Sequence, residues 1–241
     1  MPDPLIALPF VLRERLSLVE RERIQALALE ANDRYVIDVL ERENLCPYAR
    51  VGRERGATSR SVHFAHTHDS EPIGRIFDEA ASSALEVVQV IFPLVEVEAQ
   101  IFARFVNDVT EALNRRRERP VFASAALHPG LGYRRDTPTG MISLFRHAPD
   151  PTLQWVRLET LDNIYRGRKG GTSFVDLANL SRVLEATPKR DLYDEIARAN
   201  QTTAERLGID ALAQRLARLS EDTQAGYRAV LEGASVRRSD T

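Results

Sequence analysis

Apolar positions along the first fifty residues are spaced as on one face of a helix. They recur three or four residues apart, which is the period of a helix with one buried side. These positions are Ile24, Ala28, Ala31, Tyr35 and Val39. Ser17 and Glu20 have the spacing of a capping box at the start of this helix. Pro47 is expected to end it, which puts Cys46 at its C-terminal end.

Four later segments have the short apolar runs that are typical of strands. They are residues 61–67, 86–94, 121–127 and 141–147. The run at 86–94 is rich in β-branched residues, which suits a central strand. Helical spacing returns over residues 71–84 and 102–113. The pair Asp150-Pro151 is typical of a helix start and predicts a helix that carries Trp155. Residues 50–60 and 128–140 are predicted loops.

The last third of the chain is predicted to be helical. Ser173 caps a first segment, and Pro188 separates it from a second helix that Gly208 ends. A third helix is expected from Asp210 to a stop at Gly233.

Together the elements predict an α+β fold in one domain over residues 1–241. Its core spans about 17–210, and a frayed tail covers 233–241. We expect a small, mainly antiparallel sheet of about four strands, covered by helices and followed by a helical C-terminal extension.

Charge and composition exclude several classes of protein. The chain has 33 basic and 35 acidic residues and a formal net charge of −2, so it offers no general field for nucleic acid or an anionic membrane. The N-terminal segment lacks a basic start and Pro9 breaks its apolar run, unlike a signal peptide. No stretch approaches the ~20 apolar residues of a membrane span. We therefore expect a cytoplasmic protein whose partners include neither nucleic acid nor membrane.

Cys46 is the only cysteine, which excludes an internal disulfide and a multi-cysteine metal site within one chain. A catalytic cysteine acts as a thiolate and needs a nearby cation or a helix N-terminus. A helix C-terminus carries partial negative charge and raises a thiol pKa, so Arg50, Arg53 or a histidine brought close by the fold would have to compensate. The structural alternative is a small buried side chain that ends the helix. A Cys-Pro pair can also ligate ferric haem.

The predicted loop that begins at His128 has the residue types of a ligand site. This loop, 128–140, has 13 residues. Loops of this length without helices or strands are uncommon in compact domains and tend to be functional. His128 suits acid–base chemistry, and the residues after it offer an aromatic ring, a guanidinium, a carboxylate and a hydroxyl for an anionic ligand. They are Tyr133, Arg134, Asp136 and Thr137. The alternative is a hairpin whose histidine hydrogen-bonds its own loop.

Two other polar clusters have simpler explanations. His63, His66 and His68 cannot all point to one face of a strand, so solvated histidines are favoured over a metal site. The basic, Gly-rich stretch over 166–173 could hold a phosphate at a helix N-terminus. It lacks the residue order of a P-loop, and a surface loop is favoured.

Four segments, in the same order along the chain, resemble a bacterial family known as domain of unknown function family 1415. They are NLCPYAR (44–50), LHP (127–129), MISLFR (141–146) and the segment 196–208 with Asn200 and Gly208. Residues 133–138 and 166–187 depart from the family's pattern, so the chain resembles a divergent member. The resemblance implies no established activity. Its segments contain Cys46, Arg50, His128, Arg146 and Asn200, and this favours them as site residues.

Three functions stay open from the sequence, which identifies no cofactor. The first is a small-molecule enzyme for an anionic substrate, an amino acid or a carboxylate, with Cys46, His128 and Asp136 as catalytic residues. Its substrate-binding residues would be Arg50, Tyr133, Arg134, Thr137, Arg146 and Asn200. The second is a haem- or metal-dependent enzyme with Cys46 or His128 as ligand. The third is a non-catalytic ligand-binding module or a homo-oligomeric assembly module.

Overall fold

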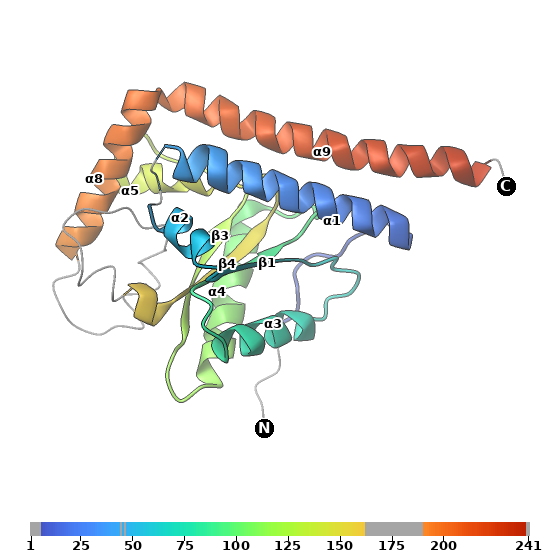
Figure 1. The fold of residues 1–241 in the computed structure, drawn as a ribbon, viewed down its shortest axis with the longest axis horizontal. Helices are drawn as coiled ribbons and strands as arrows, with labels where there is room; N and C mark the ends of the chain where they lie inside the picture. The colour runs from blue at the N-terminus through green and yellow to red at the C-terminus, as the bar shows by residue number, and fades with distance from the viewer. Residues whose placement is uncertain (1–5, 44, 46, 162–189, 240–241) are drawn as a thin grey trace.

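The computed structural model describes residues 6–43, 45, 47–161 and 190–239. They form a four-stranded sheet with helices on both faces and a helical C-terminal region, which confirms the predicted α+β class (Figure 1). The strands are β1 (Thr58–Val62), β2 (Val87–Ile91), β3 (Phe122–Leu127) and β4 (Thr152–Arg157), in the order β1-β2-β4-β3. β1 and β2 pair in parallel, whereas β4 is antiparallel to both of its neighbours.

One face of the sheet packs against α3 (Glu71–Ala81) and α4 (Ala99–Arg115). Alternate strand residues point to this face, as the period of two requires. Val90, Leu153 and Trp155 are fully buried there, and each such side chain stabilises the fold by about 1.5–3 kcal/mol. The Trp155 indole N–H donates to Thr110 Oγ1 of α4 at 2.8 Å, so its one polar atom is also satisfied.

The opposite face is covered by α1 (Leu18–Asp33), its π-helical continuation η1 (Arg34–Glu41) and the long helix α9 (Ile209–Ser239). Ile24 and Ala28 of α1 pack with Ile91 of β2 and Tyr227 of α9. α1 and α9 lie side by side (Figure 1). In the described ranges, no helix combines the length and the apolar character needed to cross a membrane.

The first helix begins as predicted. Ser17 Oγ accepts from the Glu20 backbone N–H, and the Glu20 carboxylate accepts from the Ser17 backbone N–H. The capping box is therefore confirmed. At Arg34 the α-helix changes into a π-helix, in which N–H groups bond to carbonyls five residues back instead of four.

The predicted end of this helix at Pro47 is wrong, and so is the predicted loop over residues 50–60. η1 ends at Glu41, and Pro47 is the first residue of a short helix, α2 (Pro47–Glu54). Proline suits the first helical position because no N–H is needed there. β1 follows at Thr58–Val62, earlier than the strand predicted at 61–67.

Two predictions around residue 145 are also wrong. Of the predicted strand at 141–147, residues 141–146 are helical rather than extended, in α5 (Pro138–Met141) and the 3-10 helix η2 (Ile142–Arg146). Residues 152–157 form strand β4 rather than a helix. Tertiary pairing overrides the local helix-start signal of Asp150-Pro151, because β4 is hydrogen-bonded to a strand on each side.

The C-terminal region is helical as predicted, with different bounds. α8 (Arg190–Leu207) ends at Gly208, whose φ of 81° is the left-handed conformation that glycine adopts most easily. α9 starts at Ile209 and continues past Gly233 to Ser239, so the predicted stop at Gly233 is wrong. The predicted cap at Ser173 lies outside the described residues.

α9 is attached to the sheet through a buried carboxyl group. Asp150, 1% exposed, accepts from the Tyr227 hydroxyl at 2.7 Å and from Gln224 Nε2 at 3.4 Å. Burial raises the pKa of Asp150 to about 7, and the two hydrogen bonds only partly oppose this. Burial raises the pKa of the Tyr227 phenol as well. The junction is therefore sensitive to protonation near neutral pH.

Stability should fall as the pH rises from about 4 to about 7. In this window the unfolded chain, with an Asp pKa of about 3.9, has lost a proton that folded Asp150 retains, so rising pH favours unfolding. Over the whole window the loss amounts to about 4 kcal/mol. Asp150→Asn should remove most of this dependence in urea unfolding measured at pH 5, 6, 7 and 8. Glu221→Gln, an exposed change on α9, is the control; an unaltered pH slope in Asp150→Asn would contradict the assignment.

Candidate functional site

His128 directly follows β3, and both of its ring nitrogens have backbone partners. Nδ1 accepts from the Gly130 N–H at 2.9 Å, so Nε2 carries the proton and donates to the Val97 carbonyl at 3.0 Å. The ring is buried beside Phe102, and burial lowers the pKa of His128. This is the arrangement of a histidine that holds its own loop. An acid–base or metal-ligand role would require one of these hydrogen bonds to open.

Arg134 and Asp136 lie on the surface and bind each other. Arg134 donates to both carboxylate oxygens, at 3.0 and 2.7 Å, and the side chains are 71% and 64% exposed. The Arg134 hydrogen bond is the main cause that lowers the pKa of Asp136. A carboxylate that is paired, solvated and ionised is a poor proton donor, so this geometry gives little support to Asp136 as a catalytic residue.

Thr137 and Tyr133 also have structural partners. Thr137 caps α5, accepting from the Gly140 N–H at 3.1 Å. A Cβ at Gly140 would lie 2.6 Å from the Cβ of Arg134, so this tight turn requires glycine. The Tyr133 hydroxyl accepts from Arg135 at 3.2 Å. Arg135 in turn pairs with an aspartate at the start of α9, which anchors the loop to that helix.

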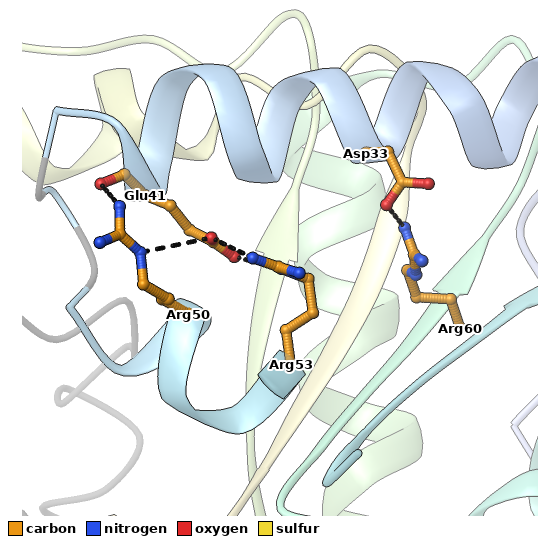
Figure 2. Close-up of polar contacts among 5 residues, drawn as sticks. All are labelled: Asp33, Glu41, Arg50, Arg53 and Arg60. Carbon is orange, nitrogen blue, oxygen red and sulfur yellow. Dashed lines mark hydrogen bonds and ion pairs between the residues drawn. The ribbon is translucent and has the colours of Figure 1, made fainter. Parts of the chain in front are cut away.

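Cys46 lies outside the described residues, whereas Arg50 belongs to a charged cluster centred on Glu41 (Figure 2). The Glu41 side chain, at the end of η1, is only 2% exposed. Arg53 donates to both of its carboxylate oxygens at 2.8 Å. Arg50 lies 3.8 Å from the same carboxylate and 3.5 Å from the Glu41 carbonyl. Glu41 therefore holds Arg53 tightly and Arg50 loosely, and Arg50 keeps N–H donors for a further anion.

A second ion pair extends this cluster. Asp33, the last residue of α1, pairs with Arg60 of β1 (Figure 2). The pKa of Arg53 is raised mainly by its hydrogen bond to Glu41 and, to a smaller extent, by the charges of Glu41, Glu54 and Asp33. The two pairs are thus within electrostatic range of each other, and together with Glu54 the cluster contains three guanidiniums and three carboxylates.

Asn200 is the most deeply buried of the described residues predicted for the site, at 1% exposure. Within the described part of the chain, neither its Oδ1 nor its Nδ2 has a hydrogen-bond partner. Leaving such a group unsatisfied costs about 1–3 kcal/mol. Its helix, α8, packs against α5 and η2. Asn200 is therefore a buried polar group with unused hydrogen-bonding capacity.

The segments that carry the family resemblance meet in one core cluster. It contains residues adjacent or close in sequence to the predicted site residues: Leu45, Leu127, Met141, Leu144, Phe145 and Ala204. The Tyr35 hydroxyl of η1 donates to the Phe145 carbonyl and ties this cluster to the first helix. The carbonyl of half-buried Arg146 accepts from the His128 N–H at 2.8 Å. The fold thus gathers these segments, while Arg134 and Asp136 remain at the surface.

The three neighbouring histidines do not converge. β1 ends at Val62, so all of them follow the strand. His63 packs against the Phe92 ring, His66 Nε2 lies 2.6 Å from an Arg21 nitrogen, and His68 bonds to a backbone carbonyl. Among the residues that the structure describes, no group of three His, Cys, Asp or Glu side chains is arranged to hold a metal ion. The Gly-rich stretch 166–173 lies outside them.

Comparison of the chain with protein-family models, with curated proteins and with solved structures gives no match. The resemblance to domain of unknown function family 1415 therefore stays a prediction.

Sequence reasoning missed the partners of Arg50. Glu41 lies off the apolar stripe of the first helix, and Arg53 falls in a segment predicted to be a loop. Their pairing depends on α2 folding back beneath η1 (Figure 2). The one available signal was Pro47, which is as typical of a helix start as of a helix end.

The two ion pairs should differ in their contribution to stability. Glu41→Gln removes a buried, bidentate, charge-assisted interaction and should destabilise the protein by about 2–3 kcal/mol. Asp33→Asn removes a partly exposed pair and should cost less than about 1 kcal/mol. Urea unfolding at pH 7 measures both. Equal losses would contradict a central role for Glu41.

Proposed function

We propose that the protein is a small-molecule enzyme whose substrate carries an anionic group, such as an amino acid or a carboxylate. Its site would lie where the 44–50, 141–146 and 196–208 segments meet. The observation that carries this proposal is the buried, unpartnered side-chain amide of Asn200.

A carboxamide has two donors and two acceptor lone pairs. Proteins rarely bury such a group without partners, because each unmade hydrogen bond lowers stability. A protein with an apolar side chain at this position would be more stable. The presence of Asn200 therefore favours a hydrogen-bond partner that arrives with the substrate. Active sites commonly carry this kind of local destabilisation.

The anionic character of the proposed substrate rests on two arginines. Arg50 is 56% exposed and only loosely held by Glu41. Arg146 follows Phe145, which packs in the same cluster as Leu45 and Ala204. Guanidinium groups bind carboxylates through two parallel hydrogen bonds, and Asn200 would orient the remainder of the molecule.

We propose Cys46 as the nucleophile because of its position in the sequence. It follows buried Leu45 and precedes Pro47, the first residue of α2. A cation such as Arg50 would favour its thiolate. The hydrogen bonds of His128 favour a supporting role for this histidine, so another group or water would transfer the proton.

Asn200→Leu separates function from stability. Because the substitution removes an unsatisfied amide, it should stabilise the ligand-free protein by about 1 kcal/mol or more, while stabilisation by any carboxylate or amino acid found in a thermal-shift screen disappears. Asn114→Leu is the matched control: Asn114 is buried with both amide atoms bonded to the backbone, and its loss should cost about 2–3 kcal/mol. Destabilisation of both variants to the same degree would reject the proposal.

The reactivity of Cys46 tests the proposed nucleophile. An ordinary thiol, with a pKa of about 8.5, loses roughly fiftyfold in alkylation rate between pH 8.5 and pH 6.5. For an activated Cys46 we expect a loss of less than about fivefold with iodoacetamide, and a larger loss in Arg50→Gln. A fiftyfold loss in the wild type would count against a nucleophile. Elemental analysis and the absorption spectrum of the same preparation test the alternative of a metal or haem ligand.

A further inference from the structure

A cavity of about 250 Å³ lies between η1 and α9. None of the residues proposed above lines it. Its floor contains the buried side chains of Val39 and Leu219, and its rim is charged. The lining residues are Arg34, Asp38, Val39, Arg215, Arg218, Leu219 and Asp222. Its volume is slightly below that of pockets for drug-sized ligands, which suits a small metabolite.

The π-helix shapes one wall of this cavity. The backbone amides of Arg42 and Glu43 donate to the carbonyls on either side of Asp38, so the Asp38 carbonyl is left out as the helix changes its bonding register. Arg215 of α9 donates to this carbonyl at 2.8 Å and to the Glu43 carboxylate at 3.4 Å. π-Helical segments are rare and are frequent at functional sites. Arg215 is thus a structural part of the wall.

Four charged side chains at the rim divide into one ion pair and two available charges. Arg34 and Asp222 form the ion pair, at 3.7 Å. Among the contacts of the described residues, the Arg218 guanidinium and the Asp38 carboxylate have no ion-pair partner, and both residues are exposed. They come from different elements, α9 and η1. A cavity with one available cation, one available anion and an apolar floor is complementary to a zwitterion that has an apolar side chain.

We propose that this cavity binds a free amino acid with a small apolar side chain. Arg218 receives the α-carboxylate, Asp38 receives the α-ammonium group, and the side chain contacts Val39 and Leu219. The site is separate from the one proposed around Asn200. η1 connects the two, because its Arg34, Asp38 and Val39 line the cavity and its last residue, Glu41, holds Arg50.

Isothermal titration of the full chain with L-valine and two matched analogues tests the need for both charges. Isovalerate lacks the ammonium group and isobutylamine lacks the carboxylate. We expect L-valine to bind at least about tenfold more tightly than either analogue, because each analogue loses one charge-assisted contact worth about 1.4 kcal/mol or more. Absence of valine binding, or equal binding of isovalerate, would overturn the proposal.

Variants locate the binding. Arg218→Gln and Asp38→Asn should each weaken L-valine binding by about tenfold or more. The controls Arg228→Gln and Glu221→Gln change exposed residues on α9 that do not line the cavity, and they should bind like the wild type. Asn200→Leu should also keep its affinity for valine. If Asn200→Leu alone abolishes binding, the amino acid occupies the site around Asn200 and the cavity proposal fails.

Discussion

The packing of one continuous helix, α1 followed by η1, across the sheet is the constraint on which the polar features of this protein depend. Ile24 and Ala28 fix its first half against β2 and α9. Tyr35, fully buried, fixes its second half to η2 through the Phe145 carbonyl. A helix held at both ends has a defined rotation about its axis, and this rotation determines where its charged residues point. For this reason Asp33 meets β1 and Glu41 meets α2 (Figure 2).

The change from α- to π-helical bonding within this helix has effects on two sides. On one side it leaves the Asp38 carbonyl to Arg215 and opens a cavity against α9. On the other side the helix ends with Glu41, whose buried side chain pairs with Arg53 of α2. A side chain with only 2% exposure and a net negative charge is stable there because Arg53 matches its geometry with two hydrogen bonds. The charged cluster and the cavity therefore share one element, η1.

Local signals were sufficient for the elements whose ends and faces are set by neighbouring residues. The capping box of Ser17 and the glycine end at Gly208 are of this kind. Local signals failed where tertiary pairing decides. Trp155 and its neighbours follow a proline that resembles a helix start, yet two flanking strands make them extended. Residues 141–146 have β-like composition, but Met141, Leu144 and Phe145 have helical spacing and are all buried.

The candidate site was also predictable only in part, because the partners of its side chains are set by tertiary packing. Sequence resemblance selected Arg50, Arg146 and Asn200, but a side chain without hydrogen bonds, such as Asn200, is recognisable only after its surroundings are known. The partners of Arg50 come from a helix that the sequence did not predict. The His128 loop had the composition of a site, and its histidine is held by the amide of Gly130 and the carbonyl of Val97, neither of which a sequence pattern reveals.

The buried carboxyl group of Asp150 couples unfolding of this protein to the release of one proton. Near pH 6 the folded chain holds that proton and the unfolded chain does not, so each unfolding event releases it to the buffer. The heat measured in calorimetry then contains the ionisation enthalpy of whichever buffer takes it up. Phosphate and an amine buffer will give different apparent enthalpies for the same transition, and this difference counts the protons directly.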